Sequence, residues 1–116
     1  MATPFYVTVS YSLEDAKGNL TGDIDQVTYY NSDAAGDMKV GSATGNTFVF
    51  MRAPARVTDI VSDVAATMLV ITLKVNNNLR NNKIRLATCT GASLKRVPIP
   101  IRIAQGAMVE WTQSAT

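Results

Sequence analysis

The stretch that decides the fold, "RVPIPIRIAQGAMVEW" at residues 96–111, alternates apolar and polar positions around a glycine turn. Side chains that alternate along an extended segment point to opposite faces, so the apolar ones predict one buried face. Gln105-Gly106 then provides the turn that leads the chain into Val109 and Trp111. The stretch therefore predicts two consecutive strands that are buried on one side.

Pro98 and Pro100 interrupt the first of these strands. Proline has no backbone N–H to donate and is confined within sheets to edge strands, first residues or bulges. Because the two prolines are two residues apart, they point the same way along the strand. We therefore expect this strand to lie at the edge of a sheet, where the prolines prevent another chain from pairing with it.

The same alternation recurs along the rest of the chain, first at residues 5–13, with apolar side chains at the odd positions. Strands separated by turns at about ten-residue intervals are typical of sandwiches and small barrels. We predict an all-β fold, a single antiparallel β-sandwich domain over residues 1–116, jelly-roll-like or a small barrel, with seven to eight strands. The predicted core is Leu69, Ile71, Leu73, Val97, Ile99, Ile101 and Trp111.

Two segments are harder to interpret. Residues 57–67 carry apolar side chains at helical spacing, which permits one short helix, but their β-branched residues favour a strand. Residues 76–82, "NNNLRNN", predict a long turn, because asparagine tolerates left-handed backbone conformations.

The net charge of +2 hides an asymmetry along the chain. Residues 1–63 hold eight acids and four bases, and residues 64–116 hold seven bases and one acid, Glu110. Two interpretations are open: either the charges mix on the surface when the two halves interleave, or the folded protein has two oppositely charged ends.

No motif for catalysis or for a bound group is present. The chain has no histidine, which is the usual general base and the commonest zinc ligand, and a single cysteine, Cys89. The glycine-containing loop at residues 41–47 lacks the lysine of a phosphate-binding loop. We expect no enzyme activity, no cofactor, no metal and no small-molecule substrate. Residues 1–15 do not resemble a secretory signal, and no apolar run is long enough to span a membrane.

The basic residues suggest two kinds of partner. Lys83, Arg85, Lys95, Arg96 and Arg102 could lie on one face of neighbouring strands and hold nucleic-acid phosphates without reading sequence. That face would lack an aromatic platform for base stacking, because residues 52–109 contain no aromatic side chain.

The alternative partner is another protein. Arg96, Pro98, Pro100 and Arg102 would then form a rigid docking strip, with Lys83 and Arg85 nearby. The strip would meet acidic loops of a neighbouring subunit, such as the loop with Asp23 and Asp25.

The segments "APARVTDIVSD", "LVITLKVNNN" and "RVPIPIRIAQGAMVEWTQ", within residues 53–113, resemble the small β-sandwich decoration, cement and minor capsid proteins of bacteriophage virions. The resemblance implies a structural role on a virion that is assembled in the host cytoplasm. It also implies a homo-oligomer, with a trimer plausible, or a subunit seated on a capsid-like protein lattice. It transfers no individual site residue to this chain.

Overall fold

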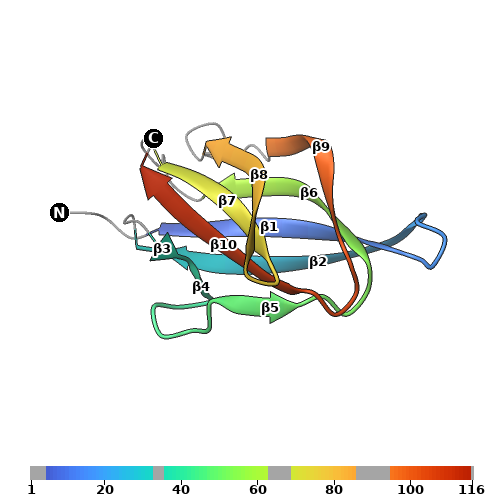
Figure 1. Cartoon of the computed structure of the whole chain (residues 1–116), viewed down its shortest axis with the longest axis horizontal. Coiled ribbons are helices and arrows are strands. Elements are labelled where there is room, and N and C mark those ends of the chain that lie inside the picture. The colour runs from blue at the N-terminus through green and yellow to red at the C-terminus, as the bar shows by residue number, and fades with distance from the viewer. Residues whose placement is uncertain (1–4, 33–35, 63–68, 86–94, 116) are drawn as a thin grey trace.

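The computed structural model describes residues 5–32, 36–62, 69–85 and 95–115, and within them the chain is all β (Figure 1). It is folded into ten strands: β1 (Phe5–Glu14), β2 (Leu20–Asn31), β3 (Gly36–Asp37), β4 (Lys39–Val40), β5 (Phe48–Phe50), β6 (Ala55–Ser62), β7 (Leu69–Val75), β8 (Asn78–Arg85), β9 (Lys95–Ile103) and β10 (Met108–Ala115). The sequence predicted seven or eight, and the additional strands are short pieces of two or three residues.

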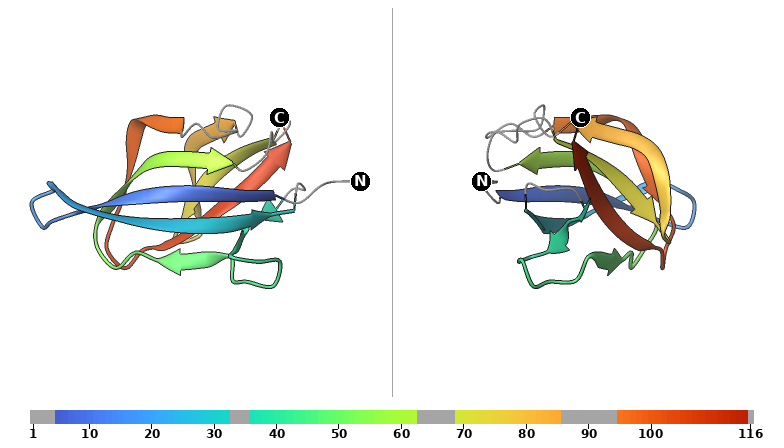
Figure 2. Two further views of the ribbon diagram at one scale, coloured as in Figure 1. Left: turned by 180° about the vertical axis from the view of Figure 1, so that it is seen from behind. Right: turned by 60° about the vertical axis from the view of Figure 1, so that its left-hand side comes forward.

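The strands form two antiparallel sheets. The first has the order β4-β2-β1-β6-β9, and the second has the order β3-β10-β7-β8, with β5 also paired to β10. β3 and β5 pair with different parts of β10, which runs past both of them (Figure 2). The overall extents are 47 × 27 × 24 Å, and the long β1–β2 hairpin lies along the longest axis (Figure 1).

The β7–β8 connection is much tighter than the sequence suggested. Instead of a long turn over residues 76–82, only Asn76 and Asn77 separate the two strands, with φ of 50° and 67°. Two consecutive residues with positive φ are what a two-residue hairpin turn requires, because its twist matches that of the flanking strands. The asparagines that follow therefore belong to β8.

The helix considered for residues 57–67 does not form over the part that the structure describes. Residues 55–62 are strand β6, and residues 63–67 lie outside the described part. Thr58 is an extra residue in the ladder with β1, since Ser10 pairs with Asp59 and Tyr11 pairs with Val57. A bulge of this kind changes the side-chain alternation, so that Val57 and Ile60 both enter the core. The three-residue spacing that suggested a helix is the consequence of this bulge.

Strand β9 lies at an edge of its sheet, as its prolines predicted. Its ladder with β6 is interrupted at the prolines: Arg96 pairs with Asp59, and the next pair is Ile101 with Val57. Residues 97–100 therefore lie opposite Thr58 alone, and the strand bends sharply there (Figure 1). The missing N–H groups therefore fall where the ladder with β6 is already open.

One cluster of buried apolar side chains joins the two sheets. β1, β2, β6 and β9 contribute from the first sheet, and β7 and β10 from the second. Of the predicted core, Ile71, Leu73, Ile101 and Trp111 are buried in this cluster, whereas the side chains at positions 69, 97 and 99 lie outside the described part. The first strand also agrees with its prediction, because its described odd-numbered apolar side chains are all buried.

A chain of hydrogen bonds runs through the middle of this core. Trp111 Nε1–H donates to the Tyr11 hydroxyl at 2.9 Å, and the Tyr11 and Tyr29 hydroxyls are 2.7 Å apart. All three residues are fully buried, so each polar atom depends on the others in place of water. Because Trp111 belongs to the second sheet and the tyrosines to the first, this network fixes how the two sheets face one another.

Substituting Tyr11→Phe tests the network. The change would leave the Trp111 N–H and the Tyr29 hydroxyl each short of a partner in a fully buried site. We expect the free energy of unfolding to fall by about 1–3 kcal/mol, measured by urea denaturation. Tyr30→Phe, a matched change on the outer face of the first sheet, should cost less. Equal losses in the two variants would contradict the structural role of the network.

The network also predicts sensitivity to high pH. Burial raises the pKa of Tyr11 to about 12 and raises that of Tyr29 as well. An unfolded tyrosine ionises near pH 10, so the stabilisation is fully present below about pH 10 and is lost as the pH rises toward 12. Thermal melts across this range should show a falling melting temperature, less steep in the Tyr11→Phe variant. A decline of the same slope in both proteins would show that other groups cause it.

Candidate interaction surfaces

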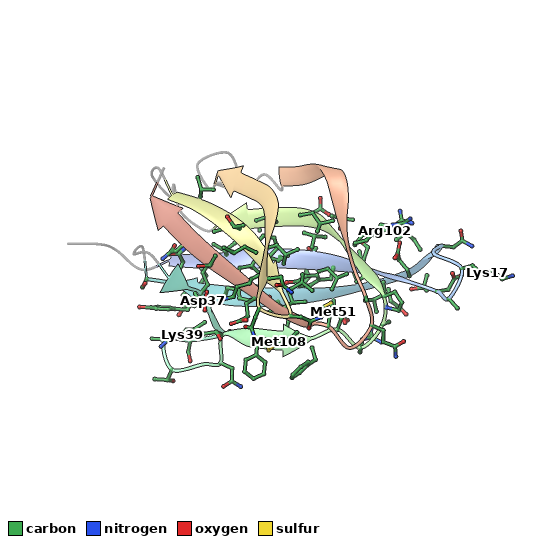
Figure 3. All side chains as sticks on the ribbon, in the orientation of Figure 1. Lys17, Asp37, Lys39, Met51, Arg102 and Met108 are labelled. Carbon is green, nitrogen blue, oxygen red and sulfur yellow. The ribbon has the colours of Figure 1, made fainter. Side chains whose placement is uncertain are left out.

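Arg102, the one docking-strip residue whose side chain the structure describes, contributes to a charge cluster with Glu14 and Arg56. The Glu14 carboxylate is buried, Arg56 Nε donates to its Oε2, and Arg102 Nε lies 3.6 Å from the same oxygen. Arg56 also donates from Nη2 to the Gly18 carbonyl at 2.7 Å. Arg102 projects outward near the base of the β1–β2 hairpin, with 66% of its side chain exposed (Figure 3). Its guanidinium is therefore accessible but already has a carboxylate neighbour within the chain.

The acidic candidates lie on the same hairpin. Asp25 accepts two hydrogen bonds from Arg52, at 2.9 Å from Nε and 3.0 Å from Nη2, and these raise the pKa of the Arg52 guanidinium. Asp23 is exposed two residues away, and its charge acts on Arg52 in the same direction. Asp25 thus has a bidentate partner inside its own chain, whereas Asp23 faces solvent.

The remaining basic candidates are divided between the sheets. Lys83 and Arg85 are on β8 and pair with Thr72 and Val70, while Arg96 is on β9. β8 and β9 are edge strands of different sheets, so these residues do not share one face of neighbouring strands. This corrects the arrangement expected for a phosphate-binding face. The side chains of residues 80–85 and 95–100, including Pro98 and Pro100, lie outside the described part.

Two of the described ion pairs join the two halves of the sequence. Lys74 Nζ lies 3.2 Å from each Asp37 carboxylate oxygen, and Arg102 approaches Glu14. Each pair joins a base from the second half to an acid from the first. Of the two interpretations of the charge asymmetry, these contacts favour interleaving over two charged ends.

Exposed apolar side chains form surfaces that sequence reasoning did not single out. Leu20 and Ile24 are 53% and 58% exposed on β2, close to the hairpin turn. Phe50, on the short strand β5, is also exposed and packs edge-to-face against Phe48. The alternation of side chains in the sequence could not predict that Leu20 and Ile24 are exposed. Their partners in β1 are Glu14 and Ser12, and the register of the ladder shifts between these two residues.

The hairpin that carries Leu20 and Ile24 extends beyond the body of both sheets (Figures 1 and 2). We call residues 14–24 the hairpin arm. Its turn is held by Asp15 Oδ1, which accepts from the backbone N–H groups of Lys17 and Asn19 at 2.8 and 3.0 Å. Lys17 lies at the tip (Figure 3). This turn closes an arm that presents the apolar side chains of Leu20 and Ile24 to solvent.

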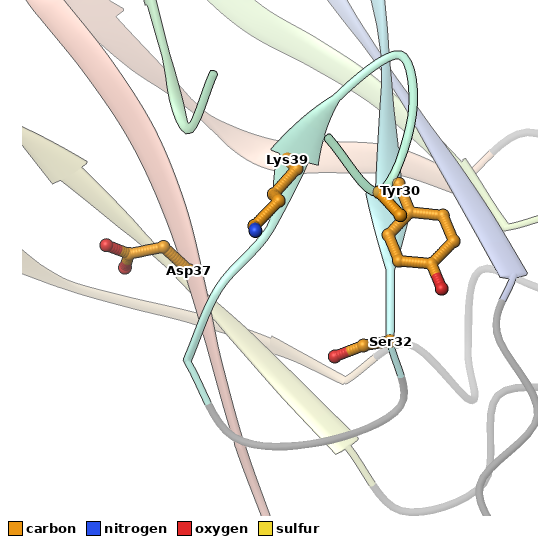
Figure 4. Close-up of a pocket in the computed structure, with 5 residues that line it drawn as sticks. Tyr30, Ser32, Asp37 and Lys39 are labelled. Atoms are coloured by element: carbon orange, nitrogen blue, oxygen red, sulfur yellow. The ribbon is translucent and has the colours of Figure 1, made fainter. Parts of the chain in front are cut away.

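A small open hollow of about 280 Å³ lies at the opposite end of the molecule from the tip of the arm (Figures 3 and 4). Tyr30, Ser32, Asp37, Lys39 and Ala43 line it. The Asp37 side chain points away from Tyr30 and Ser32 in Figure 4, and its carboxylate is engaged by Lys74. The hollow therefore lacks a convergent set of polar groups that would orient a small ligand.

Within the described ranges, no three potential ligands among histidine, cysteine, aspartate and glutamate are grouped to hold a metal ion. The described part of the chain contains no helix that is long and apolar enough to cross a membrane. No protein-family model, curated protein or solved structure matches this chain.

The two arginines at Glu14 allow a matched test of the cluster. Arg56→Met should lower the free energy of unfolding by about 1.5–3 kcal/mol, because it leaves a buried carboxylate without its main hydrogen-bond donor. Arg102→Met should cost no more than about 1 kcal/mol, since its side chain is largely exposed. Urea denaturation of both variants measures the difference, and a larger loss from Arg102→Met would contradict the assignment.

Proposed function

We propose that the protein is a non-enzymatic structural subunit that self-associates or docks on a protein lattice, as a decoration, cement or minor capsid protein of a virion does. The observation that carries the proposal is the hairpin arm, which extends past both sheets with Leu20 and Ile24 exposed. The virion setting is supported by the sequence resemblance of residues 53–113 and by the all-β fold.

The arm is suited to docking because it exposes two large apolar side chains and is braced. Burying a leucine or isoleucine side chain is worth about 1.5–3 kcal/mol, so covering both residues would favour association. Arg56 ties the turn to β6 through the Gly18 carbonyl, and Arg52 ties β2 to the segment that precedes β6 through Asp25. A segment that is held in place before contact loses little conformational entropy on binding.

The strand connections support a finer assignment of the fold as a sandwich of jelly-roll type. After the β7–β8 hairpin, β9 returns to the first sheet and pairs with β6, and β10 returns to the second sheet and pairs with β7. This winding back of the chain resembles the Greek-key connections of jelly rolls. The direct pairing of β1 with β2 is an addition to that pattern.

Nucleic-acid binding is the second candidate function. In its favour, Tyr6 and Tyr30 pack edge-to-face on the first sheet, and Lys39 pairs with Tyr30 in the ladder. These aromatic residues come from the first half of the chain and could stack on bases. Against it, Arg102, the one predicted phosphate-binding residue whose side chain the structure describes, already lies beside the Glu14 carboxylate. We therefore favour a protein partner.

Substituting Leu20→Ser together with Ile24→Ser tests the arm. Both side chains are exposed, so the melting temperature should stay within a few degrees of the original. We expect the dissociation constant for self-association or lattice binding to rise at least about tenfold, since every 1.4 kcal/mol is a factor of ten. Size-exclusion chromatography with light scattering measures the oligomer.

Gln26→Ser, an exposed polar change on the same strand, is the matched control and should leave association unchanged. Unaltered association of the double variant would overturn the role of the arm. Binding of single-stranded DNA or RNA that falls steeply with salt would favour the second candidate function instead.

A further inference from the structure

Three charged side chains, two carboxylates and one amine, meet on the outer face of the second sheet, each on a different strand. Asp37 is on β3, Glu110 is on the middle strand β10, and Lys74 is on β7, directly opposite Glu110 in the ladder. Lys74 Nζ lies 3.2 Å from both Asp37 oxygens and 4.0 Å from Glu110 Oε1. One amine thus lies beside two carboxylates, one on the adjacent strand β10 and one on β3, the strand beyond it.

Glu110 is the unusual member of this group. Its side chain is 8% exposed, and its Oε2 accepts a hydrogen bond from the Thr47 hydroxyl at 3.0 Å. Its Oε1 is buried and has no hydrogen-bond partner within the described part of the chain. A buried carboxylate oxygen without a hydrogen-bond partner lowers the stability of the fold, and the Lys74–Asp37 ion pair can form without Glu110. Glu110 Oε1 is therefore an acceptor beside the Lys74 amine that the described part of the fold does not use.

We propose that Lys74 and Asp37 form an intramolecular isopeptide bond, with Glu110 as the proton carrier. The starting groups are the Lys74 ammonium and the Asp37 carboxylate. Glu110 takes a proton from Nζ and delivers it to Asp37, which gives a free amine and a neutral carboxylic acid.

The nitrogen lone pair of Lys74 then attacks the side-chain carbonyl carbon of Asp37. A C–N bond forms, the C–O bond to the hydroxyl breaks, and the hydroxyl leaves as water with the remaining proton. The products are a neutral secondary amide and one water molecule. The step requires no oxidant, reductant or other reactant.

The positions of the strands favour this condensation. The reacting groups are held in contact by the sheet, and such positioning can be worth effective molarities of about 10⁵–10⁸ M in well-oriented intramolecular reactions.

The bond would have a clear mechanical effect. β3 has two residues and only two ladder pairs with β10, so it is the most weakly held part of the second sheet's edge. A link from Asp37 to Lys74 would pass over β10 and fix β3 to β7. This inference is independent of the proposed function, since it concerns one chain alone.

Intact-mass spectrometry of the denatured, full-length protein tests the proposal directly. We expect a mass lower by one water molecule than the sequence requires. Trypsin should then release a branched species in which peptide 18–39, containing Asp37, is joined to peptide 57–80, with Lys74 uncleaved. The same protein with Lys74→Arg should have its full mass and no branched peptide.

Two further variants separate the roles of the three residues. Glu110→Gln keeps the size of the side chain but removes the proton carrier, so it should retain the water. Asp37→Asn should form the same amide by releasing ammonia in place of water. An unmodified mass in the original protein after prolonged incubation at neutral pH would overturn the proposal, whatever the variants do. Loss of water that persists in Lys74→Arg would assign the modification elsewhere and would also overturn it.

Discussion

The hydrogen bond from Trp111 to Tyr11 is the constraint on which the rest of the structure depends. It joins a residue of β10 to one of β1 across the core, and Tyr29 completes the network from β2. Apolar contacts alone would let two sheets slide or rotate, because such contacts have little direction. A buried network has to be fully satisfied, and only one relative position of the sheets satisfies it. This relative position of the sheets also determines where the outer faces lie, and with them the hairpin arm and the group of Asp37, Lys74 and Glu110.

Much of the fold followed from the alternation of side chains, because burial of one sheet face imposes a period of two on the sequence. The edge position of β9 followed from Pro98 and Pro100 for an equally local reason. The errors arose where one residue changed the register. Thr58 forms a bulge and gives β6 a false helical spacing, and Asn76-Asn77 makes a turn so short that β8 begins inside a segment expected to be a loop.

The interaction surfaces were less predictable, because they depend on contacts between distant residues. Formal charge marked Arg102 and Asp25 as docking groups, yet their partners Glu14 and Arg52 are far away in the sequence. Nothing local to Leu20 or Ile24 indicates that β1 and β2 continue beyond the sheets, which leaves both side chains uncovered. The grouping of Asp37, Glu110 and Lys74 likewise needs the strand order of the second sheet, in which β10 separates two strands that are distant along the chain.

The interrupted ladder at residues 97–100 has a consequence for what this edge of the first sheet can pair with. Sheets that join edge to edge extend without limit, because each added strand offers a fresh edge to the next chain. The bend and the two prolines of β9 remove a straight run of donors from this edge. Strand addition is therefore blocked at β9, and any molecule that approaches this edge has to make contact through side chains. The prolines thus protect this edge of the sheet from fibre-like growth.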